Sequence, residues 1–303
     1  MFSACIAETF CAKGTKSGFS QKRDSITVLT IISENVIINI GVLRNAEKIT
    51  KEDLKMKTGL TSVSFRKLSV DEVIDLAKNA KVDGIEWGSD VHVPETDIEE
   101  AEAIAKKTRE AGLEVLSYGS YFFLSAGSDF LPYIKAALAM GTRTIRIWGG
   151  KKERWELSDE EYAALVEETR AIGKLAEENG VTVALEYHGH SITATAEDAA
   201  KFVRDVASPA IKLYWQAIIG RAHEDNLKDI DIVAPYLVNV HVFNYIDGKQ
   251  ELLETGNGAE EWRAYARRVS EIPGDRAFIT EFCKGGLRES FLSDAKVLNS
   301  IIH

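Results

Sequence analysis

From Met56 to the end of the chain, short apolar runs alternate with longer amphipathic stretches, eight of each. The apolar runs have the length of buried β-strands, and the stretches between them carry apolar residues at helical spacing. Eight strand–helix units in roughly 250 residues are typical of a (β/α)8 barrel. The alternative is a doubly wound open sheet, which rarely needs eight regular units, and no dinucleotide-binding GxGxxG follows the first strand. We therefore predict an α/β protein with a (β/α)8 barrel over residues 56–303.

The pattern gives approximate bounds for each element. We expect strands at about 57–65, 84–87, 113–118, 144–148, 181–186, 211–216, 237–242 and 277–282. We expect helices from about 70 and at 97–111, 128–140, 158–179, 195–206, 225–234, 259–271 and 288–301. Ser69 and Glu72 have the spacing of a capping box at the start of the first helix. Gly112, Gly141 and Gly180 are suited to end the second, third and fourth helices.

Residues 1–55 have a different character, because no helical period starts before about Thr50. We predict that they form a poorly ordered N-terminal extension, which is either accessory or a consequence of start-site choice. The apolar segment 26–43 is interrupted by Glu34, Asn35 and Asn39, so it does not have the continuous length of a membrane span. No membrane association is predicted.

Composition narrows the partners and the compartment. The net charge of -10 argues against nucleic acid, because phosphate binding needs a basic face. The chain has three cysteines, which are too few for a disulfide framework and suit a reducing compartment. We expect a cytoplasmic protein, and no motif decides whether it forms a homodimer.

Four polar residues stand at the ends of four consecutive predicted strands: Glu186, Gln216, His241 and Glu281. They lie 30, 25 and 40 residues apart, about one strand–helix unit each. Because the carboxyl ends of parallel strands gather at the catalytic face of a barrel, we expect the four side chains to converge. Two carboxylates, an amide oxygen and an imidazole suit Mn²⁺, Mg²⁺ or Co²⁺ better than a thiolate-preferring ion, with Zn²⁺ as a further option.

Short motifs at successive strand ends resemble those of the sugar phosphate isomerase/epimerase family. They are AspValHisValPro (90–94), SerTyrGlySerTyr (117–121), IleArgIleTrpGlyGly (145–150), GluTyrHisGly (186–189), TyrTrpGln (214–216), HisValPhe (241–243) and ThrGluPhe (280–282). The resemblance covers residues 56–303 and implies the xylose isomerase-like TIM barrel of the AP endonuclease 2-like superfamily. It implies a divalent ion, with Mn²⁺ expected, on Glu186, Gln216, His241 and Glu281. Many relatives carry Asp where this chain has Gln216.

The implied reaction is proton transfer beside the carbonyl of a small sugar or sugar phosphate. The metal would polarise the carbonyl and stabilise an enediolate. Glu186 and Glu281 would face each other across the sugar, so that one removes the proton and the other returns it. Because a metal-bound carboxylate is a weak base, His188 is a further catalytic candidate. Epimerisation and aldose–ketose isomerisation are not separated by the sequence.

Other residues near strand ends are candidate substrate contacts. Glu86 ends the second strand and could bond substrate hydroxyls or pair with Arg146, while His92 lies in the next loop. Arg146 and Trp148 share one face of the fourth strand because they are two residues apart. We expect the guanidinium to bind an anionic group and the indole to stack on a sugar ring. Trp215 is expected in the core.

Three other functions remain open. The same metal could serve elimination in a dehydratase of a keto-polyol such as an inosose. The barrel could bind a sugar without turnover, which Gln216 permits. A DNA-repair endonuclease uses a site rich in His and Asp, and six histidines in a chain of net charge -10 argue against it.

Overall fold

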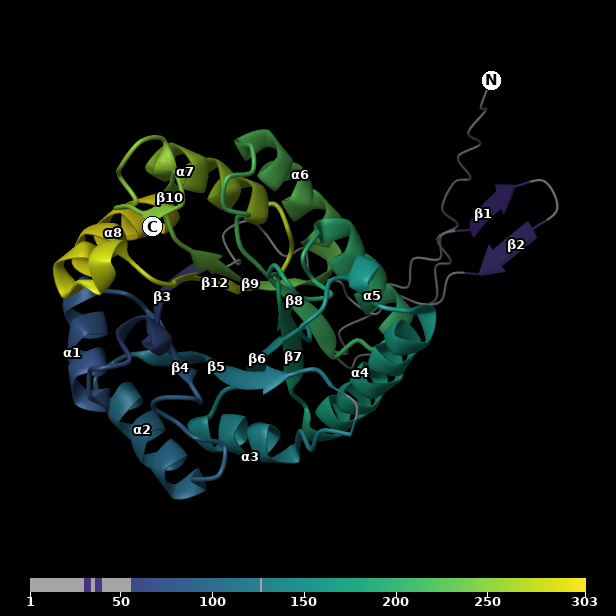
Figure 1. The fold of residues 1–303 in the computed structure, drawn as a ribbon, viewed down its shortest axis with the longest axis horizontal. Helices are drawn as coiled ribbons and strands as arrows, with labels where there is room; N and C mark the ends of the chain where they lie inside the picture. Colours follow the sequence, from purple (N-terminus) through teal and green to yellow (C-terminus); the bar gives the residue numbers. More distant parts are fainter. Residues whose placement is uncertain (1–29, 34–35, 40–55, 126) are drawn as a thin grey trace, which may run out of the picture. The chain divides into compact units, whose positions relative to one another are not determined.

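The computed structural model describes residues 30–33, 36–39, 56–125 and 127–303 (Figure 1). By its internal contacts the chain divides into Met1–Thr50 and Lys51–His303. In the first unit, β1 (Thr30–Ser33) and β2 (Val36–Asn39) pair antiparallel. The prediction of a poorly ordered extension over residues 1–55 falls mostly outside the described residues and stays a prediction.

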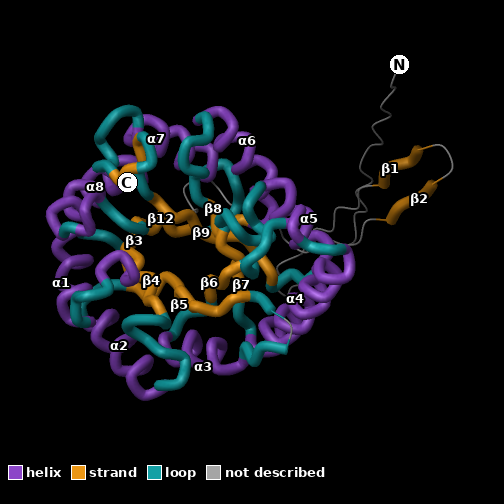
Figure 2. Tube along the Cα trace, viewed as in Figure 1, coloured by secondary structure: helices purple, strands orange, loops and turns teal. Residues whose placement is uncertain are grey.

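In the second unit, eight parallel strands close into a barrel with helices around it (Figures 1 and 2). The strands are β3 (Met56–Thr61), β4 (Gly84–Gly88), β5 (Glu114–Phe123), β6 (Thr144–Trp148), β7 (Thr182–Glu186), β8 (Ile211–Trp215), β9 (Leu237–Val242) and β12 (Arg276–Thr280). Neighbours in sequence pair in space, and β12 closes the ring between β9 and β3. The predicted (β/α)8 barrel is confirmed.

The outer layer consists of eight α-helices, one after each barrel strand. They are α1 (Val70–Ala80), α2 (Ile98–Glu110), α3 (Leu131–Met140), α4 (Asp159–Asn179), α5 (Ala196–Val206), α6 (His223–Val233), α7 (Gly258–Val269) and α8 (Arg288–Ile302). Short 3-10 turns lie at η2 (Ser62–Phe65), η3 (Arg154–Glu156), η4 (Ala234–Tyr236) and η5 (Lys284–Gly286). The predicted capping box of Ser69 and Glu72 is present at the start of α1.

Two strands differ from their predicted bounds by more than two residues. β3 stops at Thr61, and the apolar run that suggested a strand to residue 65 is a 3-10 turn. β5 continues to Phe123 instead of stopping at Tyr118. Its pairing with β6 is irregular between Gly119 and Phe123, so the strand passes Gly119 and Ser120 and resumes pairing with β6 at Trp148.

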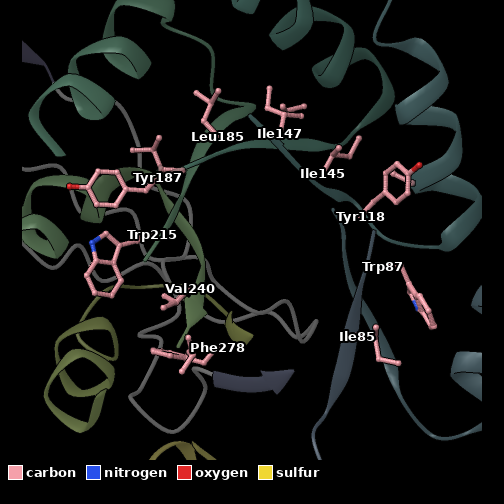
Figure 3. Packing of buried hydrophobic residues seen from close by; sticks show 14 of the residues in the cluster. Ile85, Trp87, Tyr118, Ile145, Ile147, Leu185, Tyr187, Trp215, Val240 and Phe278 are labelled. Atoms are coloured by element: carbon pink, nitrogen blue, oxygen red, sulfur yellow. The ribbon is translucent and has the colours of Figure 1, made fainter. Parts of the chain in front are cut away.

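The main core lies between the barrel and the helices. Side chains at alternate strand positions, such as Ile85, Ile145, Leu185 and Phe278, point outward and are fully buried there (Figure 3). Trp215 belongs to this layer and is 1% exposed, as predicted. The intervening strand positions therefore point into the barrel, where the functional side chains lie.

The interior of the barrel is divided along its axis. A small apolar cluster of Ala184, Tyr214, Ala277 and Ile279, here called the apolar floor, packs inside the barrel. Each strand side chain two positions further along points the same way, so Glu186 follows Ala184 and Glu281 follows Ile279. Glu86, Arg146, Glu186 and His241 form a second level, here called the charged layer, toward the carboxyl ends of the strands.

Candidate active site at the carboxyl end of the barrel

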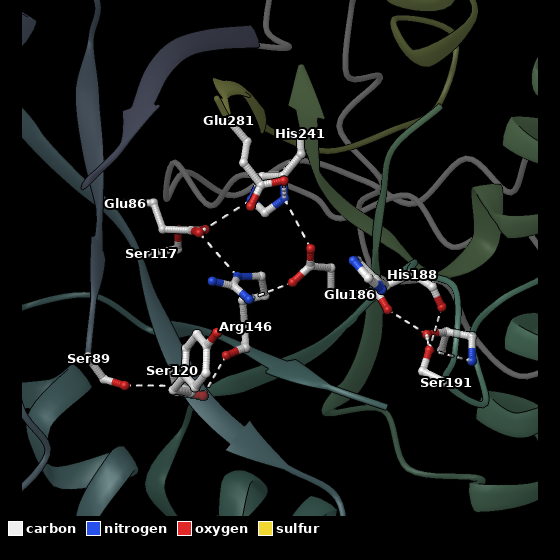
Figure 4. Close-up of polar contacts among 12 residues, drawn as sticks. Glu86, Ser89, Ser117, Ser120, Arg146, Glu186, His188, Ser191, His241 and Glu281 are labelled. Carbon is white, nitrogen blue, oxygen red and sulfur yellow. Dashed lines mark hydrogen bonds and ion pairs between the residues drawn. The ribbon is translucent and has the colours of Figure 1, made fainter. Parts of the chain in front are cut away.

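Three of the four predicted metal ligands converge. Ligand atoms of Glu186, His241 and Glu281 all lie within 4.8 Å of one another, and all three residues are buried (Figure 4). Nδ1 of His241 is 3.3 Å from Oε2 of Glu281 and 3.8 Å from Oε1 of Glu186. This group could hold a divalent ion.

Gln216, the fourth predicted ligand, directly follows β8 and lines the same pocket as Glu186 and Glu281. Its Oε1 atom is buried and accepts no hydrogen bond from the described residues. An unpaired buried carbonyl oxygen is costly, so this atom is suited to accept a partner that the protein itself does not supply. The donor set of two carboxylates, an imidazole and this amide oxygen fits a divalent ion.

Arg146 binds two carboxylates inside the barrel. Its Nη1 donates to Oε2 of Glu186 at 2.5 Å and its Nε to Oε1 of Glu86 at 3.2 Å. The same Glu86 oxygen lies 3.3 Å from Nε2 of His241, and the hydroxyl of Ser117 donates to the other oxygen. Figure 4 shows Arg146 between the two carboxylates. Glu86 is thus a buried partner of Arg146 and His241, and it does not line the pocket.

In this cluster, the interactions between opposite charges shift the pKa values more than burial does. Burial raises the pKa of Glu86, but His241 and Arg146 outweigh burial and hold this pKa far below its ordinary value. Burial also raises the pKa of Glu186, and Arg146 with His241 reverses that shift. Burial lowers the pKa of His241, yet Glu281 and Glu86 raise it well above its ordinary value. Charges of both signs therefore stabilise one another here.

A count of formal charges shows how an ion would fit. The three carboxylates of Glu86, Glu186 and Glu281 face Arg146 and one protonated imidazole, which leaves one negative charge uncompensated. A divalent ion beside a neutral imidazole would instead give three positive charges against three negative ones. Because uncompensated buried charge is unfavourable, the cluster favours binding of a dication.

Gly119 makes room for the ion pair of Glu86 and Arg146. A Cβ atom at this position would lie 2.9 Å from Oε1 of Glu86 and 3.0 Å from Nη2 of Arg146. These distances are below normal van der Waals contact. Gly119 is therefore needed because charged side chains approach the backbone of β5 closely.

The metal-ligand group opens into a pocket of about 220 Å³. Its walls are aromatic or charged: Arg66, Tyr121, Arg146, Trp148, Glu186, His188, Gln216, Phe243, Tyr245, Glu281 and Phe282, with Val63 and Ile219. Nε1 of Trp148 is buried and donates no hydrogen bond to the described residues. Two predicted substrate contacts, Arg146 and Trp148, thus line the pocket.

His188 lies at the edge of this pocket, two residues after Glu186. One ring nitrogen, Nδ1, is 2.7 Å from the carbonyl oxygen of Gly189. Because a carbonyl oxygen can only accept, Nδ1 carries the hydrogen in the neutral ring and Nε2 is left as a proton acceptor. The ring packs against Trp148 at a centroid distance of 4.6 Å, which fixes its orientation.

His92 is not in the pocket. Its two ring nitrogens lie 3.0 Å from the hydroxyl of Ser62 and 3.0 Å from the carbonyl oxygen of Leu68, and the residue is 8% exposed. Both nitrogens are therefore engaged in fixing the loop after β3. The loop after β4, which carries His92, turns the ring toward Ser62 and Leu68 and away from the pocket. In this geometry His92 does not make the predicted substrate contact.

Several pocket residues were not singled out in the sequence. Arg66 follows the 3-10 turn after β3, forms an ion pair with Asp90 and lies 5.8 Å from the ring of Tyr121. Tyr245 belongs to a hairpin of β10 (Tyr245–Ile246) and β11 (Lys249–Gln250) in the loop after β9. The Asp–Gly turn at 247–248 of this hairpin is a strong hairpin signal that could have located Tyr245.

Phe282 has a strained backbone next to a metal-ligand candidate. Its φ is 58°, in the left-handed region that non-glycine residues seldom adopt. The backbone N–H donates to the hydroxyl of Ser64 at 2.8 Å, which holds this conformation. The ring is 39% exposed at the pocket opening. Strain of this kind tends to occur at functional sites.

Cys283 follows Phe282 and is buried. Burial raises the pKa of its thiol to about 12, and the thiol donates to the carbonyl oxygen of Leu287 at 3.4 Å. A thiol that stays protonated is a poor nucleophile. Cys283 is therefore a packing residue.

The sequence also matches a known protein family. The sequence model of the xylose isomerase-like TIM barrel family matches residues 74–300. The chain belongs to this family.

Proteins similar to this chain include a dehydratase, an epimerase and a zinc-bound protein. A 3-dehydroshikimate dehydratase of Bacillus anthracis is 26% identical over 203 residues, which cover 62% of this chain and 72% of the dehydratase. A crystal structure of D-psicose 3-epimerase with D-fructose has a TM-score of 0.63 at 16% identity, covering 81% of this chain and 98% of the epimerase. The zinc-bound structure of the IOLI protein has a TM-score of 0.62 at 16% identity, covering 82% and 98%.

These matches confirm the predicted barrel fold, the named relatives include enzymes, and the reaction of this chain is left open. Among the described residues, no helix has the length and apolar character needed to cross a membrane.

Proposed function

We propose that this chain is a metal-dependent isomerase or epimerase of a small sugar or sugar derivative. The observation that carries the proposal is the convergence of Glu186, His241 and Glu281 with the unpaired oxygen of Gln216 at the base of an aromatic-walled pocket. Glu186, Gln216, His241 and Glu281 would hold the ion, with Mn²⁺ expected. When bound, a divalent ion supplies a Lewis acid that polarises a substrate carbonyl.

The contacts of the two glutamates suggest different roles. Arg146 holds Glu186 in its ionised form and occupies one of its oxygens, so Glu186 is a weak base and is best suited to bind the ion. Among the described residues, Arg146 forms ion pairs with Glu86 and Glu186 but not with Glu281, which lines the pocket. Glu281 is therefore better placed than Glu186 to carry a proton to or from the substrate.

His188 is the second proton carrier in this proposal. Its Nε2 atom can accept a proton because Nδ1 is committed to the carbonyl oxygen of Gly189. It lies on the wall of the pocket, whereas Glu281 follows β12 on another wall. Removal by one group and return by the other would invert a carbon centre, which is epimerisation.

Substrate orientation would come from Trp148 and Arg146. The free indole N–H of Trp148 can donate to a hydroxyl, and its ring can cover a sugar face. The guanidinium of Arg146 is engaged with Glu86 and Glu186, so we propose that it fixes the carboxylates and contacts the substrate only at its pocket side. Strong buried ion pairs of this kind position catalytic groups within narrow limits.

A dehydratase is the second candidate, favoured by the 3-dehydroshikimate dehydratase relative. The same base would remove a proton beside a carbonyl, and a hydroxyl on the next carbon would then leave as water. Elimination needs an acid near the leaving oxygen, and the carboxyl of Glu281 can serve once it has taken a proton. The residues that we describe therefore permit both reactions.

The test uses protein stripped with a chelator and reloaded with Mn²⁺ or Mg²⁺. Ketoses and 3-dehydroshikimate are incubated in heavy water and followed by NMR. Deuterium appearing in the ketose supports the isomerase or epimerase, and formation of an aromatic product supports the dehydratase.

Glu281→Gln should lower turnover at least about a hundredfold. The matched change Glu260→Gln, on the exposed surface of α7, should leave turnover unaltered. Full activity without metal, or in Glu281→Gln, would exclude the proposed mechanism.

A further inference from the structure

A second cavity of about 310 Å³ adjoins the active-site pocket. The two hollows share the side chains of His188, Gln216 and Ile219, as well as Phe243. The second cavity, here called the outer cavity, extends between the loops that follow β7 and β8. A molecule that projects from the pocket past these four side chains would reach the outer cavity.

The walls of the outer cavity differ from those of the pocket. They contain no Lys, Arg, Asp or Glu, and Ala194, Ala217 and Ile218 supply much of their surface. The pocket, in contrast, is lined by Arg66, Arg146 and two glutamates. A phosphate would find no lysine or arginine in the outer cavity, only the imidazoles of His188 and His190, and a buried charge without a strong counter-charge is unfavourable. The outer cavity is suited to an uncharged and largely apolar group.

The volumes of the pocket and the outer cavity also indicate a substrate that extends into both. Small-molecule sites typically measure about 300–1000 Å³. The pocket, at about 220 Å³, falls below that range by itself, whereas the pocket and the outer cavity together fall within it. A substrate that fills both hollows is larger than a single sugar ring.

We propose that the substrate is a glycoside whose sugar ring lies in the pocket and whose uncharged, largely apolar aglycone lies in the outer cavity. This rests on the proposed function for the place of the sugar ring. A glycosidic bond prevents opening of the ring at the anomeric carbon, so the reacting carbonyl must be a ketone elsewhere on the ring. The substrate class then favours epimerisation or elimination over aldose–ketose interconversion.

Ala194 offers a way to fill the outer cavity without altering the pocket. It lines the outer cavity and is absent from the lining of the pocket. Ala194→Leu would place three additional carbon atoms there. The matched control is Ala164→Leu on α4, which lines a separate surface hollow beside Leu124 and Leu165.

The experiment measures binding of methyl and phenyl glycosides of glucose and galactose to the Mn²⁺-loaded protein by titration calorimetry. The phenyl glycosides should bind at least about tenfold more tightly than their methyl partners, because a phenyl ring buries a large apolar area. Ala194→Leu should remove most of that ratio, and Ala164→Leu should keep it. Equal affinity for both glycosides, or an undiminished ratio in Ala194→Leu, would overturn the inference.

Deuterium exchange separates this inference from the proposed function. Exchange into a free ketose combined with equal glycoside affinities would leave the proposed function standing and reject the glycoside. Absence of any exchange or elimination, with selective binding of phenyl glycosides, would reject the reaction and support the outer cavity as a binding site. Failure of every sugar to bind or react would reject both.

Discussion

The two levels of the barrel interior differ in what holds them together. The apolar floor of Ala184, Tyr214, Ala277 and Ile279 is held mainly by packing, and the hydroxyl of Tyr214 also accepts a hydrogen bond from the side-chain amide of Asn239. The charged layer of Glu86, Arg146, Glu186 and His241 is held by ion pairs between groups that are at most 2% exposed. The two levels touch where the ring of Tyr214 meets that of His241 at a centroid distance of 5.0 Å.

The difference shows how one barrel separates stability from chemistry. Apolar packing contributes free energy without needing a particular charge state. A buried ion-pair network is costly to form, but once formed it fixes its members in place and in their charged forms. Two residues on the same strand can therefore differ in role: Ala184 contributes apolar packing, and Glu186 contributes to the charged layer. Substitutions at the two levels should separate the two effects.

The largest expected effect comes from removing the guanidinium of the charged layer. Arg146→Met leaves Glu86 and Glu186 buried without their main counter-charge, and the free energy of unfolding should fall by about 3–5 kcal/mol. Urea denaturation in the presence of a chelator measures this. Mn²⁺ should restore more stability to Arg146→Met than to the wild type, because it replaces missing positive charge. Lys106→Met removes an exposed ion pair on α2 and should change little.

The next effect lies in the apolar floor. Ile279 is fully buried, and Ile279→Ala should lower the free energy of unfolding by roughly 2–5 kcal/mol through lost burial and a residual cavity. Turnover per folded molecule should remain close to that of the wild type. A variant that is well folded but inactive would show that the floor also shapes the site, which would contradict the separation of the two levels.

A smaller effect is expected where the backbone meets the charged layer. Gly119→Ala puts a Cβ atom against Glu86 and Arg146, and we expect a loss of about 1–3 kcal/mol with reduced metal affinity. The matched change Gly189→Ala meets no atom within 4 Å and should be nearly neutral. Thermal denaturation and Mn²⁺ titration of both variants provide the comparison. Equal thermal stability and equal Mn²⁺ affinity of the two variants would mean that the charged layer tolerates a displacement of Glu86 and Arg146.

The last expected effect is a pH dependence of folding stability that arises at Asp294, outside both the apolar floor and the charged layer. Burial raises the pKa of Asp294 on α8 to about 6, although its carboxylate accepts the backbone N–H of Leu253 at 2.7 Å. The folded pKa thus exceeds the unfolded value of about 3.9, so this group favours folding at low pH and loses that contribution as pH rises through about 6. Asp294→Asn should gain stability relative to the wild type between pH 4.5 and 7.5, by about 1–3 kcal/mol. A constant difference across that range would refute the assignment.

Periodicity predicted the barrel, its helices and the convergence of Glu186, His241 and Glu281, because strand ends in a closed parallel barrel must share one face. It could not predict which partners a side chain chooses. Glu86 and Arg146 both point inward, but their pairing depends on the space above Gly119. The sequence predicts that His92 lies in a loop at the carboxyl end of the barrel, and it does, but that loop turns the ring toward the hydroxyl of Ser62.

Loop residues were the least predictable part of the site. Arg66 and Phe282 line the pocket through an ion pair and a strained backbone that leave no periodic signal in the sequence. Tyr245 differs, because the Asp–Gly turn that follows it indicates a hairpin. The roles of these residues toward a substrate remain predictions.

The guanidinium of Arg146 also bears on how the protein matures. Many small metalloproteins fold only when the ion arrives, because their ligands repel one another without it. In this barrel, Arg146 is an internal counter-cation that is covalently part of the chain and already neutralises much of the carboxylate charge. Folding and acquisition of the proposed ion would therefore be separate events, and that ion would be exchangeable in an assembled barrel. Cellular metal supply would then set the activity of the folded pool without setting its abundance.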